Sequence, residues 1–484
     1  MNEENRMYVP QREILLYGVA NGGQTISYNT LTGYLTYFLV NIFNVDAKIV
    51  SSMLFIEGIW DALNDPLMGS VVDRTRTRWG KLVPYLRVVP LPLAVSTALL
   101  FSGPLFVGNR APSDPVKVIY MIVTYFVWEF FYTVGDVPFW GLSTAISPSP
   151  LDRTRAITSA RFISTFLGGI PGVTIPILLD VVNGGGLGGN LRVFFCMFAI
   201  ISGTVGMVLF SLAGFFVKER IAQSNEEPSI SDSFRAMFTN RVLRLLIFKE
   251  LLSALGDIGG VFTTYYYLDV LGHASLTLLT GAPGVVVTVV SYTLIRKLKE
   301  RFNNRQLSIM SMVAPSVMTS LKFLVAIGSG RYMKLAWMIP LSIVESMFNS
   351  FFAGVGSVVP TEMIGEAVDY MEWKTGKRTE GVSFSALTFV SKFKGAISRS
   401  VGTFLIPVIG YRTSNTGAIV IQTPTTKRNI FAMYTIVPSL LRLLGIIPLL
   451  FYDLVGEKRE LMYHELTRRR AEVEKEPEEI TSPS

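Results

Sequence analysis

The sequence predicts an all-α membrane protein with about twelve transmembrane helices. Half of the 484 residues are hydrophobic and only 17% are charged. The mean hydropathy of +0.42 is too high for a soluble protein of this length. Apolar runs of about 20 residues, the length that crosses a hydrocarbon core, also recur along the whole chain.

The predicted spans follow one another with short links. They cover residues 14–42, 46–72, 86–109, 116–146, 157–183, 190–217, 242–270, 275–296, 307–329, 334–360, 381–411 and 429–453. Basic links follow the second, fourth, sixth and eighth spans. By the positive-inside rule these links are cytoplasmic, and so are both termini. This bias accounts for most of the net charge of +8, so no nucleic-acid partner is indicated.

The spans divide into two groups of six. The predicted domains are an N-terminal bundle (1–217), a cytoplasmic loop (218–241), a C-terminal bundle (242–453) and a cytoplasmic tail (454–484). A basic link after the second span of each half indicates a parallel repeat, which is typical of a two-bundle transporter. The polar N-terminus and the long first apolar run argue against a cleaved signal peptide. We therefore expect a multi-pass protein of the plasma (inner) membrane.

Three acids in the second span need an explanation. Glu57, Asp61 and Asp65 are spaced so that a helix stacks them on one face, and each ionised acid near a membrane centre costs about 2.5–3.5 kcal/mol. In one interpretation Asp65 pairs with Arg74 while the other two share protons. In the other, the carboxylates of Asp61 and Asp65 and the carbonyl of Asn64 form a site for a hard cation, which prefers oxygen ligands.

The fourth span carries a second polar stripe. Glu129, Thr133, Asp136 and Trp140 recur at helical spacing in an aromatic run. The Thr133 hydroxyl is a candidate ligand from another helix. Asp136 beside Trp140 suits a sugar, because a carboxylate accepts from hydroxyls and an indole covers the apolar face of a sugar ring. Alternatively, Trp140 is only an interfacial anchor.

Three segments carry a family resemblance: IWDALNDPLMGSVVDRTRTRWGK, TYFVWEFFYTVGDVPFWGLSTAISPSPLDRTRA and EAVDYMEWKTGKRTEG. They resemble the sodium- or proton-coupled sugar symporters of the glycoside–pentoside–hexuronide family, the melibiose permease group of the major facilitator superfamily. The resemblance covers essentially all spans and implies the major facilitator fold. Within it, Gly69, Asp73 and Arg74 resemble the cytoplasmic signature of the superfamily, which implies a conformational latch.

The resemblance also implies the site residues. The implied cation ligands, for sodium if the ion is a metal, are Asp61, Asn64, Asp65 and Thr133. The implied sugar contacts are Thr25, Asp136, Trp140, Arg161 and Lys392. Lys392 matches a lysine near both sites, whereas Arg161 could be only a positive charge at the cytoplasmic end of a helix. Glu57 and Glu129 are possible extra acids that the family pattern lacks.

One departure from the family concerns the substrate. Gln24 and Thr25 stand where the melibiose permeases have a lysine–aspartate pair. Because buried polar groups left unpaired discriminate between sugars, we expect a glycoside other than an α-galactoside. A neutral pentoside or glucoside and a hexuronide both remain open, since two cations could hold a carboxylate.

The predicted function is symport of a sugar or glycoside with a sodium ion or proton by alternating access. We expect a monomer that needs the bilayer and its coupling cation but no cofactor. The alternatives are a lipid or lysolipid transporter of the same fold and a non-transporting sugar sensor. An enzyme is not expected, because no nucleophile elbow, metal-ligand cluster or phosphate loop lies in an accessible segment.

Overall fold

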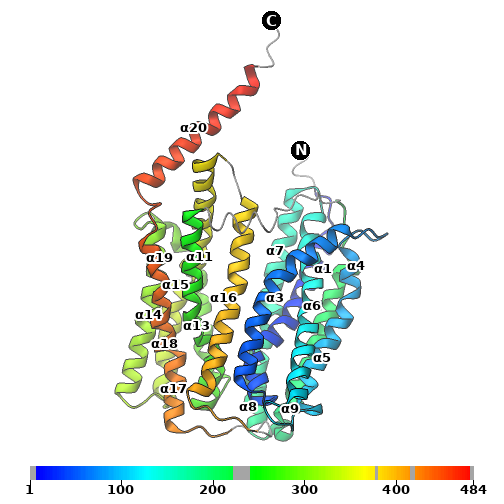
Figure 1. Cartoon of the computed structure of the whole chain (residues 1–484), viewed down its shortest axis with the longest axis vertical. Helices are drawn as coiled ribbons and strands as arrows, with labels where there is room; N and C mark the ends of the chain where they lie inside the picture. Colours follow the sequence, from blue (N-terminus) through cyan, green and yellow to red (C-terminus); the bar gives the residue numbers. More distant parts are fainter. Residues whose placement is uncertain (1–6, 222–239, 377–379, 415–419, 480–484) are drawn as a thin grey trace. The chain divides into compact units, whose positions relative to one another are not determined.

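The computed structural model describes residues 7–221, 240–376, 380–414 and 420–479. Helices occupy the ranges that hydropathy predicts (Figure 1). Within the described residues, seven helices are long and apolar enough to cross a membrane. The β-type pairing in this part of the chain is one isolated bridge between Thr77 and Gly80. An all-α membrane protein is therefore confirmed.

The chain forms two compact units. The first contains Met1–Glu226, Thr263–Thr277 and Arg399–Ile430, and the second contains Glu227–Phe262, Leu278–Ser398 and Phe431–Ser484. Helix α16 (Glu380–Val408) contributes to both, and its residues from Arg399 onward belong to the first unit. Most of the predicted inter-bundle loop, residues 222–239, lies outside the described residues, as do residues 480–484 of the predicted tail.

The elements of the first unit come mainly from the N-terminal half. They are α1 (Gln11–Thr32), α2 (Leu35–Tyr37), η2 (Phe38–Ile42), α3 (Ala47–Arg74), α4 (Val83–Val88), α5 (Pro90–Phe106), α6 (Pro115–Ala145), α7 (Pro150–Leu167), α8 (Gly169–Asn183), η3 (Gly186–Gly189), α9 (Leu191–Phe216) and η5 (Tyr266–Val270).

The second unit is built from the remaining helices. They are α11 (Arg241–Ser253), η4 (Ala254–Gly256), α13 (Leu276–Lys299), α14 (Asn304–Gly328), α15 (Leu335–Thr375), α18 (Ile436–Arg442), η6 (Leu443–Gly445), α19 (Ile446–Leu450) and α20 (Glu457–Glu479). The short helices α12 (Gly259–Tyr265) and α17 (Pro424–Tyr434) span the division between the units.

Glycines allow α1 to pack closely against its neighbours. A Cβ on Gly23 would lie 2.4 Å from the carbonyl oxygen of Gly206 on α9. Small residues let two helix backbones approach in this way inside a membrane. On α7, the carbonyl of Ala160 accepts a 3.1 Å hydrogen bond from Asn21 Nδ2. The polar segment of α1 is therefore held between α7 and α9 by backbone contact and by Asn21.

Hydrogen bonds from and to side chains hold the start of helix α6 in place. The side chain of Asp114 caps it by accepting from the backbone N–H groups of Val116 and Lys117. The buried Lys117 Nζ then donates to the carbonyls of Asn44 (2.9 Å), Gly108 (3.2 Å) and Arg110 (3.0 Å). These contacts hold the start of α6 against the loops before α3 and after α5, and α6 packs along α3.

Candidate cation and substrate site

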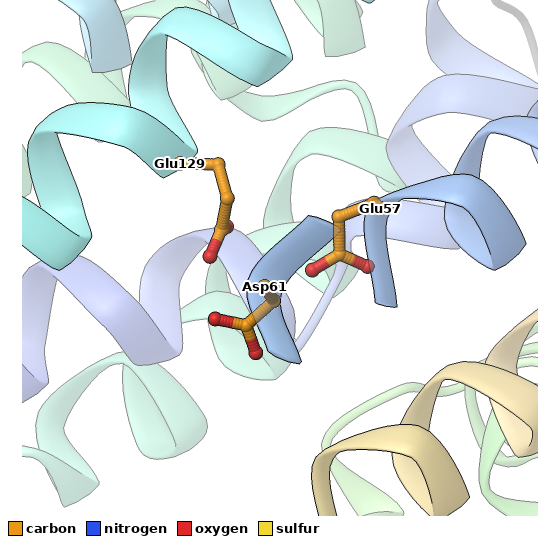
Figure 2. Close-up of side chains that lie close together, drawn as sticks. All are labelled: Glu57, Asp61 and Glu129. Atoms are coloured by element: carbon orange, nitrogen blue, oxygen red, sulfur yellow. The ribbon is translucent and has the colours of Figure 1, made fainter. Parts of the chain in front are cut away.

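Three carboxylates meet where α3 packs against α6. Glu57 and Asp61 on α3 and Glu129 on α6 each offer an oxygen, and these atoms lie within 4.8 Å of one another. Figure 2 shows the three side chains pointing toward each other. Glu57 and Glu129 are 3% and 6% exposed. We call these three residues the acidic cluster. Because water screens charges poorly at such a site, ionised carboxylates there repel one another.

Local structure and packing each bring part of the cluster together. Helix α3 is unbroken from Ala47 to Arg74, so Glu57 and Asp61 lie one turn apart on one face. Glu129 comes from α6, whose rotation is fixed by its neighbour Trp128. That buried indole donates to Thr97 Oγ1 at 3.0 Å. The spacing along the chain predicts the first pair, and packing adds the third acid.

Two of the predicted cation ligands, Asn64 and Thr133, lie about one helical turn from acids of the cluster. Asn64 and Thr133 are 5% and 1% exposed, and Asn64 Nδ2 and Thr133 Oγ1 make no hydrogen bond. Thr133 follows Glu129 by one turn, and Asn64 follows Asp61 by three residues. Unsatisfied buried polar atoms are costly, so this part of the α3–α6 interface fits an additional polar ligand.

Asp65, the remaining predicted cation ligand, is half-buried on α3. Among the described acids, the close group contains Glu57, Asp61 and Glu129 but not Asp65. The predicted cation site and the acidic cluster therefore share Asp61. Glu57 and Glu129, the two acids that the family pattern lacks, complete the acidic cluster with Asp61.

Sequence reasoning missed a cation at this site. Arg399 Nη2 on α16 lies 3.5 Å from Glu57 Oε2, and the two side chains are 29% and 4% exposed. Next to it, Ser400 fastens α16 to α3: Ser51 Oγ donates to the Ser400 carbonyl at 2.9 Å. Charged side chains within membrane spans are rare and functional. A count of every basic residue in the eleventh predicted span would have found Arg399.

Three of the predicted sugar contacts, Asp136, Trp140 and Arg161, take part in two side-chain pairs in the first unit. Gln24 Nε2 on α1 donates to Asp136 Oδ1 on α6 at 2.7 Å. The guanidinium of Arg161 on α7 lies 4.5 Å from the ring centre of Trp140 on α6, which is cation–π geometry. Thr25 is engaged within its own helix, where its hydroxyl donates to the Asn21 carbonyl at 2.8 Å. Helices α1, α6 and α7 thus bring acceptor, donor, cation and aromatic face together.

The other predicted site residues lie apart from these pairs. Lys392 is half-buried on the portion of α16 that belongs to the second unit. Of the predicted latch, Gly69 is half-buried and Arg74 is exposed at the end of α3. The side chain of Asp73 lies outside the described residues. The roles of Lys392 and of the latch stay predictions.

Comparison with known proteins identifies the family. Residues 16–456 match the family described as MFS/sugar transport protein. The chain belongs to this family. The expected resemblance to the glycoside–pentoside–hexuronide symporters is confirmed by this match and by curated relatives named as an isoprimeverose transporter and a putative glycoside/cation symporter. The protein is a multi-pass membrane transporter, and the family is one of transporters rather than enzymes.

Several curated relatives align with nearly the whole chain. The isoprimeverose transporter of Lactiplantibacillus pentosus is 28% identical over 447 residues, which cover 92% of this chain and 89% of that one. The glucuronide carrier protein homolog of Escherichia coli (strain K12) is 25% identical and covers 95% and 96%. The symporter YnaJ of Bacillus subtilis (strain 168) is 26% identical and covers 97% of each chain.

Solved structures confirm the fold. The nucleoside transporter NupG superimposes with a TM-score of 0.59 at 12% identity, covering 92% of this chain and all of that one. A bacterial homolog of the human lysosomal transporter Spinster gives a TM-score of 0.57 at 13% identity, covering 91% and 95%. At such low identity the likeness concerns the fold of the transporters and not their substrates.

Proposed function

We propose that this transporter couples the uptake of a sugar or glycoside to the entry of a sodium ion or proton. It works by alternating access between two six-helix bundles, residues 1–217 and 242–453, with both termini in the cytoplasm. It acts as a monomer in the plasma (inner) membrane. The observation that carries the proposal is the acidic cluster, with the sugar-type pairs of α1, α6 and α7 in the same unit.

The residues present fit a hard monovalent cation. Such an ion prefers several oxygen ligands, and three carboxylates offer oxygens within 4.8 Å of one another. The buried Thr133 hydroxyl lacks a hydrogen-bond partner one turn from Glu129. Asp61, Asn64, Asp65 and Thr133 are the proposed ligands, with the extra acids beside them. A bound ion supplies positive charge to these acids.

The substrate half of the site fits a sugar. The Asp136 carboxylate can accept hydrogen bonds from sugar hydroxyls. Gln24 Nε2, which donates to Asp136 Oδ1 at 2.7 Å, has a second N–H that can donate to a sugar oxygen. Trp140 offers an aromatic surface, and Arg161 a guanidinium beside it. A relative that transports isoprimeverose favours a neutral pentoside, whereas a glucuronide carrier homolog favours a hexuronide. The proposal includes both classes.

Uptake into proteoliposomes tests the function. The panel contains pentosides, hexosides, hexuronides and lysolipids, each with a sodium gradient, a proton gradient or neither. We expect accumulation of one sugar class with one gradient. Accumulation of lysolipid alone would instead favour the lipid transporter, and binding of a sugar without uptake would favour the sensor.

Competition and one variant then choose between the sugar classes. Melibiose should inhibit far more weakly than the best substrate, because neutral Gln24 and Thr25 replace charged groups. For a hexuronide, Arg161→Gln should reduce uptake by about 10-fold or more, since a charge-assisted hydrogen bond is lost. Neutral-sugar uptake in the same variant should change less. Melibiose inhibition equal to that of the best ligand would contradict the substrate assignment.

A further inference from the structure

Arg399 occupies an unusual position next to the acidic cluster. Its Nη2 atom is 3.5 Å from Glu57 Oε2, a carboxylate whose side chain is only 4% exposed. The neighbouring Ser400 is fastened to Ser51 of α3 in both directions: Ser51 Oγ donates to the Ser400 carbonyl (2.9 Å), and Ser400 Oγ donates to the Ser51 carbonyl (2.8 Å). The backbone of α16 is therefore anchored beside α3, while the long Arg399 side chain extends to Glu57.

The contact is looser than a locked ion pair. In the same unit, both terminal nitrogens of Arg220 donate hydrogen bonds to Glu13, each to a different carboxylate oxygen at 2.7 Å. That bidentate geometry is the strong arrangement for arginine and carboxylate. Arg399 approaches Glu57 at 3.5 Å, and 29% of its side chain is exposed. The Arg399–Glu57 contact is therefore weaker than the Arg220–Glu13 contact.

A guanidinium and three carboxylates meet at the site. The three carboxylates converge, and the guanidinium of Arg399 lies 3.5 Å from one of them, Glu57. Like charges in a poorly screened site repel strongly. A guanidinium and a metal ion attracted to the same carboxylates therefore oppose each other. Thr133 Oγ1, 1% exposed and without a hydrogen-bond partner one turn from Glu129, offers a metal ion a further oxygen ligand.

We propose that Arg399 is a tethered counter-ion of the acidic cluster, which a bound sodium ion displaces from Glu57. This inference rests on the proposed cation coupling and names how the same site is regulated. In the absence of metal, Arg399 partly neutralises the cluster and weakens it for sodium. When sodium binds, Arg399 is released, so ion occupancy is transmitted to α16. By linkage, whatever releases Arg399 from Glu57 tightens sodium binding by the same factor.

Sodium affinity of the purified protein tests the inference without relying on transport. Calorimetry or displacement of radioactive sodium should give a dissociation constant about 10- to 100-fold lower for Arg399→Gln than for the wild type, because a repelling charge is removed. Arg399→Lys keeps the charge and should stay within about threefold of the wild type. Arg220→Gln is the matched control, since it removes an arginine that pairs with Glu13 and should leave sodium affinity unchanged.

A double variant tests whether Arg399 acts on sodium binding through Glu57. If Arg399 acts through the cluster at Glu57, Arg399→Gln should change sodium affinity much less in a Glu57→Gln background. Equal effects in both backgrounds would show that Arg399 acts elsewhere. Unchanged or weaker sodium binding in Arg399→Gln would overturn the inference while leaving the proposed coupling intact. A wild type that binds no sodium would refute sodium coupling and the inference together.

A measurement on the wild-type protein covers the case in which Arg399→Gln does not fold. An arginine-selective dicarbonyl reagent, with mass spectrometry of the peptide that contains Arg399, should modify this residue severalfold faster in sodium than in choline. Arg220 provides the internal reference, and its modification rate should not respond to sodium. Equal rates for Arg399 in both salts, in protein shown to bind sodium, would overturn the inference.

Discussion

In the first unit, three carboxylates meet beside one guanidinium, whereas in the second unit one buried lysine faces one buried glutamate. Lys322 Nζ on α14 lies 2.6 Å from Glu345 Oε2 on α15, and the side chains are 0% and 11% exposed. The other oxygen of Glu345 accepts from Thr319 Oγ1 at 2.7 Å. The ring centre of Tyr434 lies 5.0 Å from the Lys322 ammonium.

The difference separates two uses of buried charge. A matched pair whose carboxylate oxygens are both occupied has no need of an ion, and we interpret Lys322–Glu345 as a contact that holds α14 to α15. The acidic cluster brings three carboxylates together beside a buried Thr133 hydroxyl without a hydrogen bond. Converging like charges therefore indicate a binding site, whereas an isolated pair of opposite charges indicates a structural contact.

The largest expected effect is on the matched pair. Lys322→Met leaves the Glu345 carboxylate buried without its partner, which should lower the free energy of unfolding by about 3–5 kcal/mol. Thermal or denaturant unfolding of the purified protein in detergent measures this. Lys297→Met, at an exposed lysine of the same unit, is the control and should shift stability by less than about 0.5 kcal/mol. Wild-type stability for Lys322→Met would remove the distinction between the two regions.

The next effect concerns the cluster. Asp61→Asn removes the residue shared by the cluster and the predicted cation ligands, so sodium affinity should fall by about 100-fold or more, beyond the 10–100-fold typical of outer-shell partners. Gradient-driven accumulation of the substrate should be lost with it. Unlike Lys322→Met, this variant should fold with at least wild-type stability in sodium-free buffer. Intact accumulation in Asp61→Asn or Asp61→Cys would refute the cation assignment.

A third variant tests whether repulsion within the cluster is real. Glu129→Gln should weaken sodium binding by about tenfold, which is about 1.4 kcal/mol. In sodium-free buffer the same variant should be more stable than the wild type by about 1 kcal/mol. The substitution removes the carboxylate that Glu57 and Asp61 repel. Unfolding measured with and without sodium separates the two effects. Loss of stability in both buffers would instead make Glu129 a structural residue.

The smallest change is expected where both charges of the matched pair are removed. The double variant Lys322→Met with Glu345→Met should be within about 1 kcal/mol of wild-type stability, because apolar side chains can replace a buried ion pair. Recovery relative to Lys322→Met alone is the informative comparison. A double variant as unstable as the single one would show that the pair contributes more than mutual neutralisation.

Hydropathy predicts where the apolar part of a helix lies better than where the helix ends. The predicted span 334–360 corresponds to α15, which starts at Leu335 but continues to Thr375. The additional turns, EMIGEAVDYMEWKT, are helical but polar, and a hydropathy window detects apolarity rather than helicity. The helices α1 and α3 likewise are not among the seven described helices that are long and apolar enough to cross a membrane. They carry the polar groups of the proposed site.

The sequence alone determined the membrane class, the approximate positions of the helices, the family and the one-turn spacing of Glu57 and Asp61, because these follow from the order of residues along one segment. The sequence marks Glu129 only as an additional acid and does not single out Arg399. Their meeting with Glu57 depends on how α3 packs against α6 and on where Ser400 anchors α16. Distances between helices arise from side-chain packing across the fold, so the acidic cluster and its guanidinium were decided by the tertiary structure.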